Sequence, residues 1–158
     1  HIYSYSSGVP ISILRISSVY SELKYAPNLK RAIPDFLRAE KTGNDLDIWG
    51  NGTAKRDYIY VDDVITAIIT SITNKISGLF NIASGQSKSV MDSARIIKQL
   101  SNKKLNIKKV VGKQIESDSD INKPTKCFYD IGLARKKLDF VPKYLLEKGL
   151  SKCIQSNC

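Results

Sequence analysis

With 158 residues, 42% of them hydrophobic and 25% charged, the chain has the size and composition of one globular domain. With this balance the chain can bury a core and need not be disordered. The longest apolar-rich stretch, residues 61–72, is too short and too polar to span a membrane. The formal charge of +10 favours an anionic partner, either a small ligand or a nucleic acid.

The three cysteines are Cys127, Cys153 and Cys158, and the only histidine is His1. Their number and spacing fit neither a zinc site nor a disulfide framework, so the sequence predicts no metal and a reducing, cytoplasmic compartment. Much of the positive charge lies in residues 103–113, where lysines alternate with apolar residues and no aromatic side chain is interleaved. We interpret this stretch as a strand edge guarded by lysine, in preference to a nucleic-acid interface.

The first part of the chain predicts alternating strands and helices. Residues 9–16 form a β-branched run that is typical of a buried strand, and residues 28–42 carry a helical apolar stripe that ends at a glycine. Residues 46–49 alternate with period two and stop at a glycine turn, and residues 56–61 predict a second short strand. Asp62 is the expected N-cap of the next helix. That helix is predicted to bury one face, formed by Val64, Ile65, Ile68, Ile69 and Ile72.

Residues 78–83 predict another strand, and Ser89 with Asp92 predicts a capping box at the start of a helix that runs to about Leu100. Residues 106–111 predict a strand. The remaining expectations are a loop at 112–125, a short strand at 127–129, a helix capped by Asp130 that ends at Leu138, and a last helix near 145–155. Strands that alternate with helices indicate an α/β architecture.

Four segments carry a resemblance to a known family, and the second is the most specific. They are residues 13–20, 46–52 with 56–64, 78–85 with 89–90, and 129–142 with 146–150. The second segment contains the run Leu46-Asp47-Ile48-Trp49-Gly50-Asn51-Gly52 and then Arg56-Asp57-Tyr58. In this order the segments resemble the extended short-chain dehydrogenase/reductases of the nucleotide-sugar epimerase/dehydratase type.

The resemblance implies that residues 1–158 are the C-terminal portion of such an enzyme. This portion would comprise the last part of a Rossmann-type NAD(P)-binding fold plus the small C-terminal substrate-binding lobe. The N-terminal dinucleotide-binding half, with its glycine-rich loop and catalytic Tyr-x-x-x-Lys pair, would be absent, so no catalytic residue is assigned. Tyr20 and Lys24 have that spacing but follow the strand, whereas the family's pair lies on the helix before it. Residues 1–8 are typical of a helix end, so we expect a chain cut from a longer one, with a processed start as the alternative.

A nucleotide-diphosphate sugar is the ligand that the resemblance implies. Arg56 would grip the diphosphate, for which a guanidinium fork is well suited, and the alternative is an ion pair with Asp57 or Asp62. Trp49 would stack on the nucleobase, although a chain's only tryptophan is as often part of the core. Backbone groups of Ile48 would lie along the same base.

The other implied site residues follow from matching positions. Ile16 and Ser17 would border NAD or NADP, most of which the absent half would bind. Ser18 stands where the family commonly has Asn, and Ser21-Glu22 replaces a Gly-Pro pair. Lys123 lies in a loop where many members carry an arginine. The implied substrate contacts are Ser18, Arg31, Ala32, Ile33, Ile48, Trp49, Arg56 and Lys123.

The expected function is that of a fragment of an NAD(P)-dependent nucleotide-sugar epimerase or dehydratase, inactive alone and part of a homodimer in the full-length protein. Two alternatives stay open. One is the reductase branch, which acts on 4-keto sugar nucleotides. The other is a non-catalytic module that docks anionic partners through its lysines. The sequence specifies neither the nucleotide and sugar, nor NAD against NADP, nor the outcome of the reaction.

Overall fold

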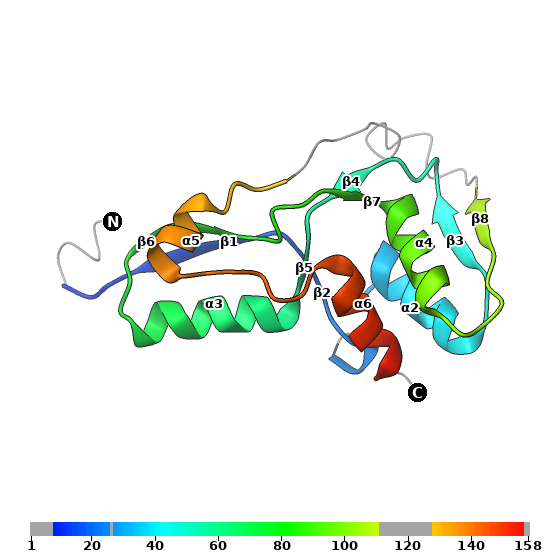
Figure 1. Cartoon of the computed structure of the whole chain (residues 1–158), viewed down its shortest axis with the longest axis horizontal. Helices are drawn as coiled ribbons and strands as arrows, with labels where there is room; N and C mark the ends of the chain where they lie inside the picture. The colour runs from blue at the N-terminus through cyan, green and yellow to red at the C-terminus, as the bar shows by residue number, and fades with distance from the viewer. Residues whose placement is uncertain (1–7, 26, 111–127, 157–158) are drawn as a thin grey trace.

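The computed structural model describes residues 8–25, 27–110 and 128–156. At one end of the molecule, β1 (Ser12–Ile16) and β6 (Gly78–Ile82) form a parallel pair. α3 (Val61–Thr73) lies along this pair and α5 (Gly132–Leu138) packs beside β6, as Figure 1 shows. The α/β prediction is confirmed.

The other end of the molecule is mainly helical. Three helices, α2 (Ala32–Thr42), α4 (Val90–Leu100) and α6 (Leu146–Gln155), pack against one another there (Figure 1). A second parallel pair, β3 (Leu46–Trp49) and β8 (Ile107–Val110), lies beside α2 and α4.

Two short strand pairs and a 3-10 turn lie between these two ends. β2 (Ser18–Tyr20) pairs in parallel with β5 (Tyr58–Tyr60), and β4 (Lys55–Arg56) pairs antiparallel with β7 (Lys88–Ser89). A 3-10 turn, η1 (Leu23–Tyr25), follows β2. Within the described ranges every sheet has only two strands.

The apolar side chains form two separate clusters. The cluster under β1 and β6 contains Ile59, Val64, Ala67, Phe80, Ile82, Ala134, Leu138 and Phe140. The larger cluster, at the helical end, is formed by residues from α2, α4, α6, β3 and the β2–β5 pair. Its members include Tyr20, Phe36, Leu37, Leu46, Ile48, Tyr60, Ile97, Leu105, Leu150 and Cys153.

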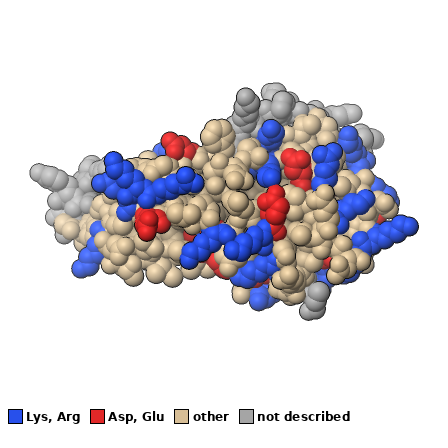
Figure 2. Space-filling view, viewed as in Figure 1, with Lys and Arg blue, Asp and Glu red and all other residues tan. Residues whose placement is uncertain are grey.

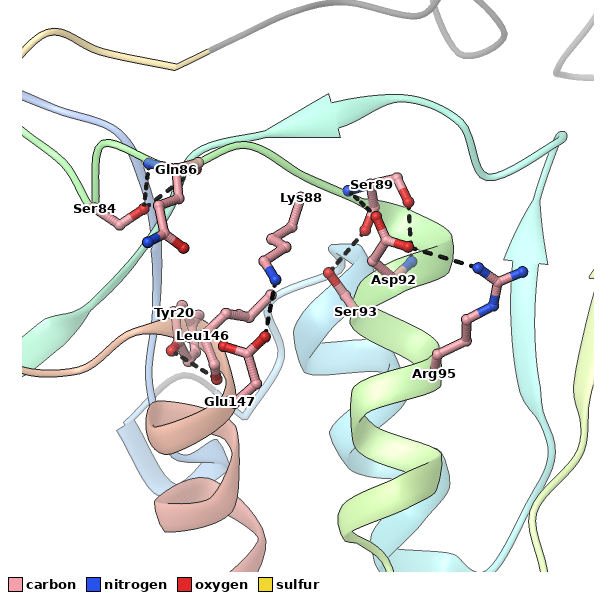
Figure 3. A network of polar contacts seen from close by, with 10 residues as sticks. All are labelled: Tyr20, Ser84, Gln86, Lys88, Ser89, Asp92, Ser93, Arg95, Leu146 and Glu147. Carbon is pink, nitrogen blue, oxygen red and sulfur yellow. Dashed lines mark hydrogen bonds and ion pairs between the residues drawn. The ribbon is translucent and has the colours of Figure 1, made fainter.

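Local sequence signals set several helix ends. Gly43 ends α2 with φ of 73°, in the left-handed region that glycine tolerates, and its N–H donates to the Glu40 carbonyl at 3.1 Å. The capping box of α4 is confirmed, since the Ser89 Oγ accepts from the Asp92 N–H and the Asp92 carboxylate accepts from the Ser89 N–H, each at 3.0 Å (Figure 3).

Other local predictions are wrong. The predicted strand 56–61 divides at Asp57 into β4 and β5, and Val61 already belongs to α3. Tyr60 is therefore the N-cap of α3, and Asp62 lies within its first turn. Phe128 and Tyr129 are not in a strand, whereas Cys127 and the loop predicted at 112–125 lie outside the described residues.

The buried face predicted for α3 is also largely wrong. Val64 is buried, together with Ala67 and Ser71. The four isoleucines of the predicted face remain exposed: Ile65 at 46%, Ile68 at 38%, Ile69 at 55% and Ile72 at 69%.

In the part of the chain that the structure describes, no helix is both long and apolar enough to cross a membrane. The same residues contain no cluster of three or more His, Cys, Asp or Glu side chains arranged to hold a metal ion.

Candidate functional site

A hollow of about 320 Å³ lies where the first turn of α2 meets β2, the end of β4 and the start of β5. We call it the arginine hollow. Its walls combine tyrosine and aliphatic side chains with two arginines, and no carboxylate is among its described lining residues. These are Ser18, Val19, Tyr20, Arg31, Ala32, Ile33, Pro34, Arg56, Tyr58 and Val90.

Arg31 and Arg56 give the hollow its charge. They are 25 positions apart in the sequence, and the fold brings both to one cavity because α2 begins beside the end of β4. Both side chains are exposed, and one arm of Arg56 donates to the Lys55 carbonyl at 2.8 Å. Two guanidinium groups on one cavity, whose described lining residues include no carboxylate, make a site that favours a multiply charged anion.

The start of α2 adds to this preference. Arg31 is the N-cap residue, in extended backbone, and its side chain does not cap the helix. The first N–H groups of a helix have no intrahelical acceptor, and here they belong to Ala32 and Ile33, which line the hollow. A helix N-terminus carries partial positive charge, so backbone and side chains act in the same direction.

Asp57 holds the β4–β5 corner that carries Arg56. Its side chain is 1% exposed and accepts from the Ser84 N–H at 2.8 Å, the Ser84 hydroxyl at 2.7 Å, the Gly85 N–H at 3.1 Å and the Tyr129 N–H at 3.2 Å. Asp62, the other partner considered for Arg56, instead pairs with Lys152 at 2.7 Å. Both carboxylates are thus engaged with groups outside the arginine hollow.

Two buried tyrosines, Tyr20 and Tyr58, form the aromatic wall of the hollow. Burial raises the pKa of Tyr58, and Arg56 lowers it to a smaller extent. Burial also raises the pKa of Tyr20, whose ring packs edge-on against Tyr60 with centroids 5.5 Å apart. Lys24, four positions after Tyr20, lies over the Tyr25 ring, with its Nζ 4.8 Å from the ring centroid.

Trp49 lies in a second, open groove of about 500 Å³ on the other side of α2. The Trp49 side chain is 56% exposed, so it is available for stacking and is not part of the core. In contrast to the arginine hollow, this groove has carboxylates in its wall. Its lining residues are Asp35, Phe36, Arg38, Ala39, Thr42, Asn44, Asp45, Asp47 and Trp49.

The structure therefore brings five predicted site residues into one cavity: Ser18, Arg31, Ala32, Ile33 and Arg56. It places Trp49 in the second groove and buries Ile48 completely in the core. Ile16 and Ser17 lie at the carboxyl end of β1, outside both, and Lys123 lies outside the described residues. The sequence analysis missed five lining residues, although most of them lie within the segments that carry the resemblance. They are Val19, Tyr20, Pro34, Tyr58 and Val90.

On the face of the molecule shown in Figure 2, the lysine and arginine side chains of the described residues do not form one stripe. Figure 2 shows them at both ends of the visible face, interspersed with acidic residues. Several are in ion pairs, such as Lys88 with Glu147 at 2.9 Å and Lys108 with Asp45 at 2.7 Å. The stretch predicted as a lysine-guarded strand edge contains β8, which pairs with β3.

Comparison with known proteins gives this geometry a context. The chain is 33% identical over 144 residues to the dTDP-4-dehydro-6-deoxyglucose reductase of Escherichia coli. The matched residues make up 90% of this chain and 43% of the reductase. It is 29% identical over 149 residues to a UDP-N-acetyl-alpha-D-glucosaminuronate decarboxylase of Bacillus cytotoxicus, covering 94% of this chain and 46% of the decarboxylase. The chain thus spans less than half the length of these relatives.

Solved structures of similar fold lead to the same group. The UDP-glucose 4-epimerase of Thermotoga maritima, solved with UDP-glucose, superposes on this chain with a TM-score of 0.76 and 26% sequence identity. The superposition covers 98% of this chain and 48% of the epimerase chain. The UDP-glucuronic acid 4-epimerase of Bacillus cereus, solved with UDP-glucuronic acid and NAD, superposes with a TM-score of 0.74 and 25% sequence identity. This superposition covers 99% of this chain and 48% of that epimerase chain.

The family model of the NAD dependent epimerase/dehydratase family matches residues 1–83, more than half of the chain. This match spans the β1–β6 pair, α2, α3 and both arginines of the hollow. The Rossmann-type α/β fold expected from the resemblance agrees with it. The chain belongs to the NAD-dependent epimerase/dehydratase family.

Proposed function

We propose that this chain is the substrate-binding portion of an NAD(P)-dependent enzyme that modifies nucleotide sugars, and that the arginine hollow holds the diphosphate of the substrate. The observation that carries the proposal is the convergence of Arg31, Arg56 and the start of α2 on one cavity. A diphosphate offers the two charges and several acceptor oxygens that these donors require.

The two hollows suggest how a nucleotide sugar would lie. Both are on α2, the arginine hollow at its first turn and the groove with Trp49 from Asp35 onward. With the diphosphate at Arg56, the base would extend toward Trp49, whose exposed ring is free to stack. The sugar would lie at the tyrosine wall, toward Ser18. The names of the decarboxylase and reductase relatives, which refer to UDP and dTDP sugars, support this ligand class.

Ile16 and Ser17 are proposed to supply this chain's part of the cofactor site. In open parallel sheets, ligands bind at the carboxyl ends of the strands, and Ile16 and Ser17 occupy that end of β1. The Ser17 Oγ is buried without a hydrogen-bond partner among the described residues, as expected of a group that awaits a ligand or another chain segment. Bound NAD(P) would supply hydride transfer at a sugar carbon.

The catalytic acid/base pair and most of the cofactor site would belong to a dinucleotide-binding half outside these 158 residues. The isolated chain is therefore proposed to bind nucleotide without turnover. The proposal includes a homodimer of the full-length protein and a reducing, cytoplasmic setting. The family membership favours an enzyme over a non-catalytic lysine-docking module.

Isothermal titration of the chain with UDP and with dTDP tests the proposal. We expect saturable binding of at least one of them, and a loss of about ten-fold or more in affinity for Arg56→Ala, because the arginine's charge-assisted hydrogen bonds to phosphate are removed.

Lys55→Ala is the matched control. It removes one positive charge from the same strand, but Lys55 does not line the hollow. Equal losses for the two variants would indicate a general charge effect and would contradict a diphosphate site at Arg56. No heat with either nucleotide would contradict the proposal as a whole.

A further inference from the structure

The groove beside α2 carries an aromatic ring and a carboxylate on the same face of one strand. In β3 the side chain of Ile48 is buried, whereas its neighbours Asp47 and Trp49 are both exposed and both line the groove. Alternate residues of a strand point to the same face and lie roughly 7 Å apart. A planar ring that stacks on the indole therefore has the carboxylate of Asp47 within reach of its edge.

Asp47 is the carboxylate of this groove that has no partner of its own. Asp35 is ion-paired with Arg38, and Asp45 is ion-paired with Lys108 at 2.7 Å. Lys108 is also opposite Asp47 in the β3–β8 pair, but its ammonium group is held by Asp45. Within the described part of the chain, Asp47 makes neither a hydrogen bond nor an ion pair. Its two oxygens are thus available to accept hydrogen bonds from a ligand.

The edge of a nucleobase decides how it meets a carboxylate, which can only accept hydrogen bonds. Guanine presents a ring N–H and an adjacent amino group, two donors side by side that match the two carboxylate oxygens. Uracil and thymine present one N–H between two carbonyl oxygens, and these oxygens would face the carboxylate oxygens. In cytosine and adenine the amino group is next to an acceptor nitrogen. Guanine is consequently the base that satisfies both oxygens.

We infer that Asp47 selects guanine as the base of the nucleotide sugar, with Trp49 as the surface on which the base stacks. The inference rests on the proposed function, because a diphosphate in the arginine hollow directs the base along α2 into this groove. The groove, of about 500 Å³, has room for a purine. The names of the decarboxylase and reductase relatives refer to UDP and dTDP, so the selection of guanine is inferred from the residues of this chain alone.

The fluorescence of Trp49 tests the inference, because it is the only tryptophan of the chain and reports directly on the groove. The 158-residue chain is titrated with GDP and with UDP, which carry the same diphosphate on different bases. We expect both to quench the emission, with half-saturation by GDP at a concentration about ten-fold lower. Asp47→Asn should raise the half-saturating concentration of GDP by about ten-fold and should not raise that of UDP, because its amide offers guanine one acceptor and a mismatched donor.

Asp139→Asn is the matched control. It removes the same charge at an exposed position outside the groove, where asparagine tolerates the φ of 50°. It should leave the ratio of the two half-saturating concentrations unchanged. Equal effects of Asp47→Asn and Asp139→Asn, quenching by UDP at concentrations as low as for GDP, or no quenching by either nucleotide would overturn the inference.

Arg56→Ala separates this inference from the diphosphate site. If the diphosphate lies in the arginine hollow, the variant weakens GDP and UDP by the same factor and preserves the preference for GDP. Equal binding of the two nucleotides, both weakened by Arg56→Ala, would overturn the selection of guanine and leave the diphosphate site standing. A preference for GDP that depends on Asp47 but not on Arg56 would support the base site and contradict the diphosphate site.

Discussion

Arg56 and Asp57 are neighbours in the sequence with opposite environments. The arginine is exposed at the hollow, whereas the aspartate is buried and accepts hydrogen bonds from three separate residues. Asp57 lies between the end of β4 and the start of β5, and its hydrogen bonds fix the backbone directly after Arg56. The chemistry proposed for Arg56 depends on this aspartate.

Replacement of Asp57 by asparagine tests this role. The amide keeps the shape but offers one acceptor oxygen where the carboxylate offers two, and its NH₂ group would face N–H donors. We expect the free energy of unfolding to fall by about 2–3 kcal/mol, as for buried hydrogen bonds to a charged group. Urea denaturation measures the change. Asp47→Asn, on the exposed face of β3, should have almost no effect, and equal stability of the two variants would contradict the role.

At the scale of helices and strands, close contact between α6 and β2 depends on a glycine. Gly149 is buried within α6, and a Cβ at this position would overlap the hydroxyl of Tyr20. Tyr20 is 3% exposed and close to the start of α6, where its hydroxyl lies 3.5 Å from the Leu146 carbonyl (Figure 3). The Tyr20 ring also packs edge-on against the Tyr60 ring, which restricts its movement away from α6.

Gly149→Ala should consequently destabilise the protein by about 1–3 kcal/mol, even though alanine favours helix more than glycine does. Thermal unfolding measures this. Tyr20→Phe in the same chain should restore part of the loss, because the clashing oxygen is removed while the ring carbon near Gly149 remains. Ser151→Ala, two positions away in α6, is the control. An alanine variant at 149 as stable as the original would show that the contact is loose.

Elements with a complete local signal were predictable from the sequence. The capping box of α4, the glycine that ends α2 and the alternation of β3 each require only neighbouring residues. The pairing of β2 with β5 was not predictable, because Ser18 meets Tyr58 across 40 positions and neither short strand has a pattern of its own. The isoleucines of α3 recur at helical spacing, but this spacing does not tell whether a partner is present to bury them.

The candidate site was predictable to a similar extent. The resemblance singled out Arg31 and Arg56, but nothing in their local sequence places them in one cavity. Their proximity arises from the packing of α2 beside β2, β4 and β5. Trp49 lies in the second groove and not with Arg56. Successive side chains of a strand point to opposite faces, so Trp49 points outward where its neighbour Ile48 is turned into the core.

At the scale of the whole molecule, two core clusters are joined through adjacent aspartates of α3. Asp63 is 2% exposed, and its carboxylate accepts from the N–H groups of Lys143 at 2.9 Å and Tyr144 at 3.0 Å. These two residues lead from α5, at one cluster, into α6, at the other. Asp62 is part-exposed and reaches α6 through its ion pair with Lys152.

The two aspartates allow a matched comparison of a buried and an exposed link. Asp63→Ala leaves two backbone donors without an acceptor, so we expect a loss of about 2–3 kcal/mol in the free energy of unfolding and faster hydrogen exchange in α6. Asp62→Ala breaks an ion pair that water already screens, and its effect should be much smaller. Denaturation and exchange measured on both variants decide the matter. If the two lose equal stability, or if α6 remains protected in Asp63→Ala, the buried carboxylate does not couple the clusters.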